Sequence, residues 1–275
     1  MNRKTGTMAL LCSAFLVIGC SDGTTSTEDA MMDKGLSEDL ELIQQRKVYF
    51  GHMSVGDNLM DGVQELATES DIPLNVVWLA EPGVPASPYF AHSKIANNRF
   101  PFDKCDVFSA YVDTLAADSV DVVMMKFCYV DFDQGDNPEE IFLYYQKTME
   151  ALRNRYPRIE FIHITTPVTT RQSGWKRFAK SLLGREDNAD LYAYKRAVFN
   201  EFLLNEYQAE PLFDLAAIES SLPDGSQRSF VLDGKKVYTL RDDFTDDGGH
   251  LNKKGRKVVG RAFIRAIADV LRRGM

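Results

Sequence analysis

Five short apolar runs alternate with helical patterns along the chain, and this alternation constrains the fold more than any other feature. The runs are continuous and rich in Val, Ile and Phe, as expected of strands that are buried on both faces. They begin at Lys47, Leu74, Val120, Ile159 and Ala209. Strands separated by helices pair in parallel through right-handed crossovers. The order therefore predicts a three-layer α/β/α sandwich around a central five-stranded parallel sheet.

Local signals place several other elements. Asn137 and Pro138 suit the cap and first position of a helix, and a second helix is expected over residues 189–207. The Asp233-Gly234 pair stands between two β-type runs. Both residues suit the positive φ angles of a type I′ turn, so a β-hairpin is expected there.

The start of the chain is typical of a secretory leader, with basic residues followed by an apolar run that ends in "VIGC". These four residues resemble a bacterial lipobox, which implies a lipoprotein signal peptide over residues 1–19 and lipidation of Cys20. An ordinary leader cleaved nearby is the alternative. Residues 20–39 are polar and indicate a flexible tether, so a single domain is expected over residues 40–275.

Lipidation at Cys20 would place the protein in the bacterial cell envelope, anchored to the membrane by lipid. Ser21 after the cysteine favours the outer membrane, facing the periplasm or the cell surface. Such a compartment is oxidising, and Cys105 and Cys128 are the other cysteines of the mature chain. The sequence leaves open whether they form a disulfide.

The net charge of the chain and the motifs that it lacks argue against several classes of partner and cofactor. The chain has 40 acidic against 32 basic side chains, which argues against nucleic acid as a partner. It contains neither HExxH nor paired CxxC, and neither GxGxxG nor GxxxxGK[ST]. We therefore expect no metal and no nucleotide cofactor.

Ser54 directly follows the first apolar run, at the start of a helical pattern. Ligands bind at the carboxyl ends of parallel strands, and amides at a helix N-terminus stabilise negative charge. Ser54 is therefore a candidate nucleophile, although a plain helix cap explains a serine there equally simply.

Asp247 and His250 lie three residues apart in "DDGGHLN", before the last helical pattern. A serine hydroxyl needs a base, and an imidazole base needs a partner that fixes its tautomer. The pair supplies both functions. A surface turn of the same composition is the alternative.

A strand-end serine near the N-terminus and a DxxH before the final helix resemble the SGNH, or GDSL-like, hydrolase family of esterases and deacetylases. The resemblance covers about residues 45–272. It implies a flavodoxin-like sandwich and a metal-independent serine hydrolase in which Ser54 is the nucleophile, His250 the general base and Asp247 its orienting acid. The backbone amides of Ser54 and Gly83 would then form the oxyanion hole, although Gly83 suits a simple turn equally well.

Two of the family's sequence blocks are altered. The third block normally contains an asparagine that donates to the oxyanion, and Val130 stands in its place within "CYVD". Valine cannot donate a hydrogen bond, so the sequence leaves the third donor open. The first block reads "GHMS", with Met53 in place of the usual aspartate.

Several residues are candidates for substrate binding: His52, Tyr129, Asp131, Trp175 and Arg177. His52 suits a strand-end histidine bonded to backbone equally well, and the segment around Trp175 and Arg177 suits an amphipathic lid. His92 and His163 are expected to be structural.

Together with the resemblance, these observations favour a serine esterase that removes acyl groups, such as acetyl, from a carbohydrate or another small ester in the cell envelope. The carbohydrate is implied by the expected location and by the substrates of the family that the chain resembles, and not by any residue. Two alternatives stay open. One is a non-catalytic carbohydrate-binding lipoprotein on the same fold, and the other is an acyltransferase that uses the same three residues.

Overall fold

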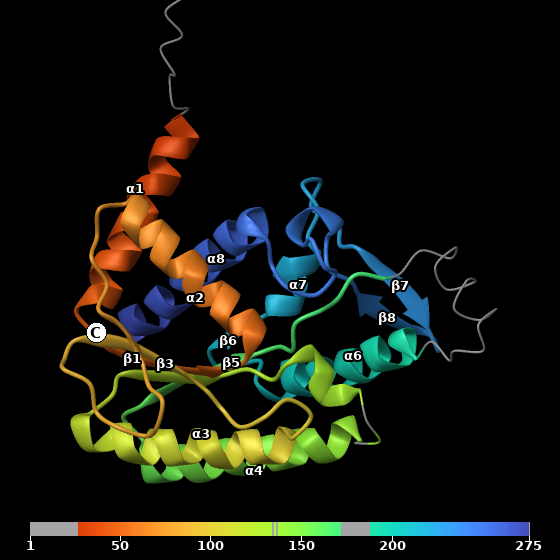
Figure 1. The fold of residues 1–275 in the computed structure, drawn as a ribbon, viewed down its shortest axis with the longest axis horizontal. Coiled ribbons are helices and arrows are strands. Elements are labelled where there is room, and N and C mark those ends of the chain that lie inside the picture. Colours follow the sequence, from red (N-terminus) through yellow and green to blue (C-terminus); the bar gives the residue numbers. More distant parts are fainter. Residues whose placement is uncertain (1–26, 134, 136, 172–187, 275) are drawn as a thin grey trace, which may run out of the picture.

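The computed structural model describes residues 27–133, 135, 137–171 and 188–274, and within them a central sheet of six parallel strands (Figure 1). The spatial order is β2-β3-β1-β4-β5-β6. The strands are β1 (Lys47–His52), β2 (Val76–Trp78), β3 (Tyr89–Lys94), β4 (Val122–Met125), β5 (Glu160–Ile164) and β6 (Leu212–Phe213). Every described pairing in this sheet is parallel.

The predicted number of five strands is wrong by one, because β3 was not recognised. Its sequence, "YFAHSK", ends in polar residues and lacks the apolar run expected of a central strand. The structure satisfies these polar groups in the interior. The Ser93 hydroxyl lies 2.8 Å from that of Tyr49, and His92 Nδ1 lies 2.9 Å from His52 Nε2. Hydrogen-bonded polar groups can be buried at little cost, so β3 fits between β2 and β1.

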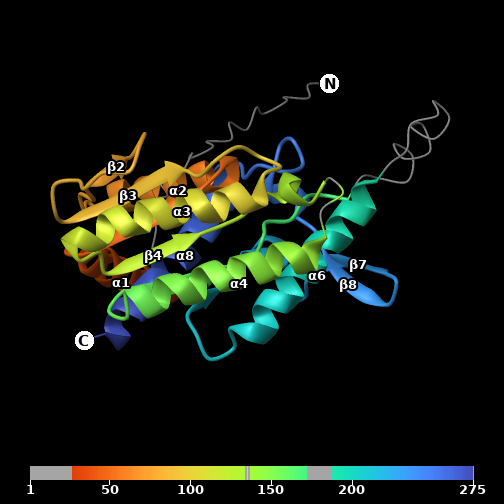
Figure 2. The ribbon, with the colours of Figure 1, turned by 90° about the horizontal axis from the view of Figure 1, so that it is seen from below.

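Helices cover both faces of the sheet, which confirms the three-layer sandwich (Figures 1 and 2). One face carries α1 (Thr27–Gln44), α2 (Ser54–Glu69), α7 (Leu215–Ser220) and α8 (Lys253–Arg273). The other carries α3 (Pro101–Leu115), α4 (Pro138–Arg155) and α6 (Ala189–Glu206). The Asn137 side chain accepts from the backbone N–H of Glu139, as the predicted cap requires.

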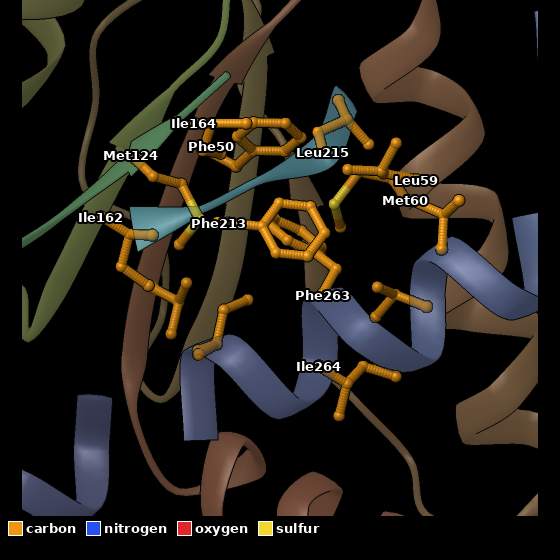
Figure 3. Packing of buried hydrophobic residues seen from close by; sticks show 14 of the residues in the cluster. Phe50, Leu59, Met60, Met124, Ile162, Ile164, Phe213, Leu215, Phe263 and Ile264 are labelled. Carbon is orange, nitrogen blue, oxygen red and sulfur yellow. The ribbon is translucent and has the colours of Figure 1, made fainter. Parts of the chain in front are cut away.

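The core on the α2 and α8 side centres on aromatic side chains from three elements (Figure 3). The ring of Phe263 in α8 lies 5.1 Å from that of Phe50 and 5.3 Å from that of Phe213, between centroids. Helices α2 and α8 also approach closely, because a Cβ on Gly62 would lie 2.4 Å from the carbonyl oxygen of Arg256. This contact holds α2, which begins at Ser54, against α8, which follows the loop of Asp247 and His250.

Helix α1 corrects the predicted tether and domain boundary. It begins at Thr27, so the boundary expected between residues 39 and 40 falls inside a helix. Leu36 and Asp39 are already buried. The Asp39 carboxylate forms ion pairs with Arg265 and Arg272 of α8. Leu36, Leu40 and Ile43 of the helix belong to the buried core, so the helix is part of the domain.

The β-hairpin predicted around Asp233 and Gly234 is present. Strands β7 (Ser229–Leu232) and β8 (Lys235–Tyr238) form an antiparallel hairpin, and φ is 49° at Asp233 and 76° at Gly234, as a type I′ turn requires. Short 3-10 helices cover Ala116–Asp118, Tyr129–Phe132 and Asp242–Phe244. Among the described residues, no helix has the length and apolar content needed to cross a membrane.

Candidate active site

Ser54 lies where β1 ends and α2 begins, and its side chain is not a helix cap. The cap position belongs to Met53, which has an extended backbone (φ −130°, ψ −165°) and makes no side-chain cap bond. Ser54 is the first helical residue. Its partly exposed hydroxyl is therefore free to pair with a side chain from elsewhere in the fold.

That side chain is His250, and Asp247 is bonded to its other nitrogen. His250 Nε2 lies 3.0 Å from Ser54 Oγ, and Nδ1 lies 2.6 Å from Asp247 Oδ2. An ionised carboxylate can only accept, so Nδ1 carries the proton and Nε2 accepts from the serine hydroxyl. The loop before α8 and the loop after β1 thus bring together the three residues predicted from the sequence.

Asp247 is held as an anion by the turn around it. Partial burial alone would raise the pKa of its carboxyl, but hydrogen bonds outweigh this and hold the pKa well below its usual range. The Asp247 carboxylate accepts from the His250 backbone N–H at 2.8 Å, from the His250 ring, and from the Gly249 N–H at 2.9 Å. Gly248 has a φ of 92°, which glycine adopts without strain and which lets the turn close.

Asn58 is a contributor that the sequence analysis missed. Its Oδ1 accepts from the backbone N–H of Leu251 at 3.0 Å. This bond ties the loop of His250 to α2, one turn beyond Ser54. An asparagine at this helical spacing after the serine is the sequence signal that could have found it.

Tyr129, a candidate substrate-binding residue, lies against His250. The two rings meet edge to face, 6.0 Å between centroids. A Cβ on Gly249 would lie 2.9 Å from the Tyr129 hydroxyl oxygen, so this glycine permits the contact. Burial raises the pKa of Tyr129 to about 12, which keeps the phenol protonated and able to donate.

Asp131 has a structural position and not the substrate-binding one expected from the sequence. Its side chain is fully buried. The Asp131 carboxylate accepts from Lys104 Nζ at 2.6 and 2.8 Å and from the backbone N–H groups of Arg99 and Cys128 at 2.8 and 2.7 Å. Asp131 thereby fastens the loop after β3 to the loop after β4.

Gly83 is also placed differently from the expectation. It follows β2, which is the edge strand of the sheet, and β3 lies between β2 and β1. The loop that neighbours the end of β1 is instead the one after β3, where the Ile95 N–H donates to the His52 carbonyl at 3.1 Å. The missed strand explains the error, because Gly83 was assigned by counting strands.

His52 is fully buried, which corrects its candidacy as a substrate-binding residue. Its Nδ1 lies 3.0 Å from the Met53 carbonyl oxygen, so the alternative of a strand-end histidine bonded to backbone holds. His163 is likewise buried, between Tyr145 and Glu210. Trp175, Arg177 and Cys20 lie outside the described residues.

The two cysteines of the domain are both buried and unpaired, so there is no disulfide between Cys105 and Cys128 in this structure. Burial raises the pKa of the Cys105 thiol well above its usual value. Across the described ranges, no group of three or more His, Cys, Asp or Glu side chains has the arrangement to hold a metal ion.

No protein-family model and no curated protein sequence matches the chain. Among solved structures it is similar to a lipase/acylhydrolase from Enterococcus faecalis, with 13% identity and a TM-score of 0.47 over 82% of this chain and 96% of the other. A family 3 carbohydrate esterase from Clostridium thermocellum has 14% identity and a TM-score of 0.43, over 83% and 98%. The periplasmic domain of a Salmonella Paratyphi A lipopolysaccharide acetyltransferase has 11% identity and a TM-score of 0.45, over 89% and 98%. Similarity of this degree carries no conclusion about the activity of this chain.

Proposed function

We propose that the protein is a serine ester hydrolase of the SGNH type. The observation that carries the proposal is the hydrogen-bonded chain from Ser54 Oγ through His250 to Asp247. Ser54 lies near the start of the domain, and His250 and Asp247 lie near its end. Ser54 and His250, whose side chains are in contact, are 196 residues apart in the sequence. They meet at the carboxyl end of the sheet, where parallel α/β folds bind ligands. A purely structural serine needs no such partners.

The geometry supports acyl transfer through a covalent intermediate. Ser54 Oγ attacks the ester carbonyl carbon while its proton passes to His250 Nε2, and Asp247 stabilises the imidazolium. The tetrahedral intermediate collapses, the bond to the alcohol oxygen breaks, and His250 returns the proton to the leaving alcohol. Water then attacks the acyl-serine by the same route, which releases the carboxylic acid and restores the hydroxyl.

The oxyanion is stabilised at the N-terminal end of α2. The backbone N–H of Ser54 is one of the helix amides without an intrahelical acceptor, and the helix dipole favours negative charge there. The second donor in this proposal is an amide of residues 96–98 in the loop after β3, and not Gly83, because β3 is the neighbour of β1. The amides at the two ends of that loop already donate to His52 and Asp131. Tyr129, beside His250, is the candidate third donor in place of the asparagine replaced by Val130.

The proposed substrate is an acylated, for example acetylated, carbohydrate of the bacterial cell envelope, reached by a protein anchored through a lipid at Cys20. The leader and the "VIGC" stretch support the location. Support for the sugar comes from Trp78, whose side chain is 48% exposed beside the bonded pair His52 and His92. Lys94 Nζ lies 5.9 Å from its ring centroid. Sites that bind small molecules are lined by aromatic side chains and a few placed polar groups, and Trp78 with Lys94 offers this combination.

Hydrolysis of 4-nitrophenyl acetate by the purified protein tests the activity. We expect Ser54→Ala and His250→Gln each to lower kcat by at least about 10³-fold, as for members of a unit that act together. Ser226→Ala is the matched control, since Ser226 lies in the exposed turn with Asp224, and its activity should equal that of the wild type. An unchanged rate in Ser54→Ala would contradict the proposal.

A further inference from the structure

We infer that His52 and His92 form a positioning relay that sets the direction of the Ser54 backbone N–H, the proposed oxyanion donor. The inference rests on the proposed function and adds two residues to it. Neither imidazole is expected to touch substrate. Both act through the peptide bond that joins Met53 to Ser54.

The hydrogen bonds fix which nitrogen of each ring carries the proton. His52 Nδ1 lies 3.0 Å from the Met53 carbonyl oxygen. A carbonyl only accepts, so Nδ1 is protonated, and Nε2 of the neutral ring must accept. His92 Nδ1 lies 2.9 Å from that Nε2 and therefore donates to it. The result is a one-directional chain from His92 to His52 to the Met53 carbonyl.

Burial keeps both rings in the neutral form that this chain requires. His52 is fully buried, and desolvation, with a contribution from the charge of Lys126, lowers its pKa well below the usual value. Desolvation also lowers the pKa of His92 to about 4. Each neutral imidazole carries one N–H proton. His92 donates its proton to His52, and His52 donates its own to the Met53 carbonyl.

The Met53 carbonyl and the Ser54 N–H belong to the same planar peptide unit, so fixing one end fixes the other. The carbonyl oxygen also accepts from the backbone N–H of Gly56 at 2.6 Å and from that of Asp57 at 3.3 Å. The His52 bond adds a donor from outside the helix. Hydrogen bonds at a peptide oxygen polarise the unit, which strengthens its N–H as a donor.

The first turn of α2 is packed directly on the His52 ring. A Cβ on Gly56 would lie 2.3 Å from both Cβ and Cγ of His52, so only glycine fits. The His52 and His92 rings stack at 5.2 Å, and Trp78 closes the far side with its ring edge-on to His92 at 5.2 Å. Substrate has no access to His52 through this packing, which excludes a direct binding role.

Matched substitutions separate positioning from simple stability. Asparagine places an amide NH₂ where the histidine has Nδ1, so His52→Asn keeps a donor to the Met53 carbonyl whereas His52→Leu removes it. His92→Asn and His92→Leu form the same pair one step away. His163→Leu is the control for loss of a buried, hydrogen-bonded histidine, since His163 lies in β5 and bonds Tyr145 and Glu210.

The readout is kcat and KM for 4-nitrophenyl acetate, with active serine counted by a fluorophosphonate probe so that only folded enzyme is compared. We expect kcat to fall about 10- to 100-fold in His52→Leu with KM unchanged, because a misdirected oxyanion donor acts on the transition state. His52→Asn should recover most of kcat. The loss of kcat should be larger in His92→Leu than in His92→Asn. His163→Leu should lose thermal stability but keep kcat.

Equal kcat in the asparagine and leucine variants of an active protein would overturn the relay and leave the proposed hydrolase standing. Equal loss of kcat in His52→Leu and His163→Leu would overturn it as well, because the effect would then follow stability alone. A wild-type protein with neither hydrolysis nor probe labelling would overturn the proposed function and this inference with it.

Discussion

Lys104 and Asp131 form a fully buried ion pair, with the ammonium nitrogen 2.6 Å from one carboxylate oxygen and 2.8 Å from the other. The pair connects α3 to the loop after β4, which also carries Tyr129 beside His250. A buried charge without its partner is costly, so the site depends on a contact that no substrate reaches.

Asp131→Ala is therefore expected to destabilise the protein by about 3–5 kcal/mol, because the Lys104 ammonium would remain buried and unpaired. Urea unfolding measures the change. The double variant Lys104→Met with Asp131→Leu removes both charges and should be more stable than Asp131→Ala. A loss below about 1 kcal/mol in the single variant would show that water relieves the charge.

Gly62→Ala should destabilise the domain by about 1–3 kcal/mol, since the added Cβ would meet backbone of α8, which cannot move aside as a side chain can. Gly35→Ala in α1 is the matched control. Nothing lies within 4 Å of a Cβ placed there, so the substitution should stabilise the helix by about 0.5–1 kcal/mol. Thermal unfolding of both variants checks the pair, and equal effects would contradict the close α2 and α8 packing.

The buried His163 should make stability fall in acid. Burial lowers the pKa of this side chain to about 4 although its neighbour Glu210 favours the charged form. The unfolded chain binds the proton below about pH 6.5, whereas the folded state resists until about pH 4. The contribution of His163 is thus fully present above pH 6.5 and is lost as the pH falls to 4, by up to about 3 kcal/mol. Denaturant unfolding at several pH values, compared with His163→Gln, should show a steeper loss in the wild type. If the free energy of unfolding depended on pH in the same way in both proteins, His163 would make no such contribution.

Trp78→Ala tests the proposed sugar contact apart from the chemistry. KM for an acetylated oligosaccharide should rise on the order of tenfold, which corresponds to about 1.4 kcal/mol of binding. KM for 4-nitrophenyl acetate should stay the same, because that ester has no sugar ring. Leu143→Ala, an exposed apolar residue of α4 on the other face of the sheet, serves as the control. Equal changes for both substrates would remove Trp78 from the sugar site.

The residues brought together at the site were predictable where local pattern and chemistry agree. Ser54 directly follows an apolar run, so its position at a strand end made it a candidate. Asp247 and His250 stand before an amphipathic helix and were found because a serine nucleophile needs a base and an acid that orients it. The strand β3 was not predictable, because its polar residues are buried only through partners such as Tyr49 and His52 that lie far away in the sequence.

That one omission explains two of the site errors. Because β3 was missed, Gly83 in the loop after β2 was assigned to the position that belongs to the loop after β3, beside the end of β1. Because the pairing of His92 with His52 was not foreseen, the sequence left open whether the His52 imidazole meets substrate or bonds to backbone. The role of Asp131 was mispredicted for a related reason. Its partner Lys104 lies in a helix, and lysine side chains are normally exposed to solvent, so a buried ion pair was not expected.

The most direct test of the central claim is to treat the purified protein with a fluorophosphonate probe and locate the adduct by peptide mass spectrometry. We predict a single adduct on the peptide that contains Ser54, with labelling strongly reduced in His250→Gln because the hydroxyl then lacks its base. Labelling that leaves Ser54 unmodified, or that proceeds equally without His250, would contradict the account.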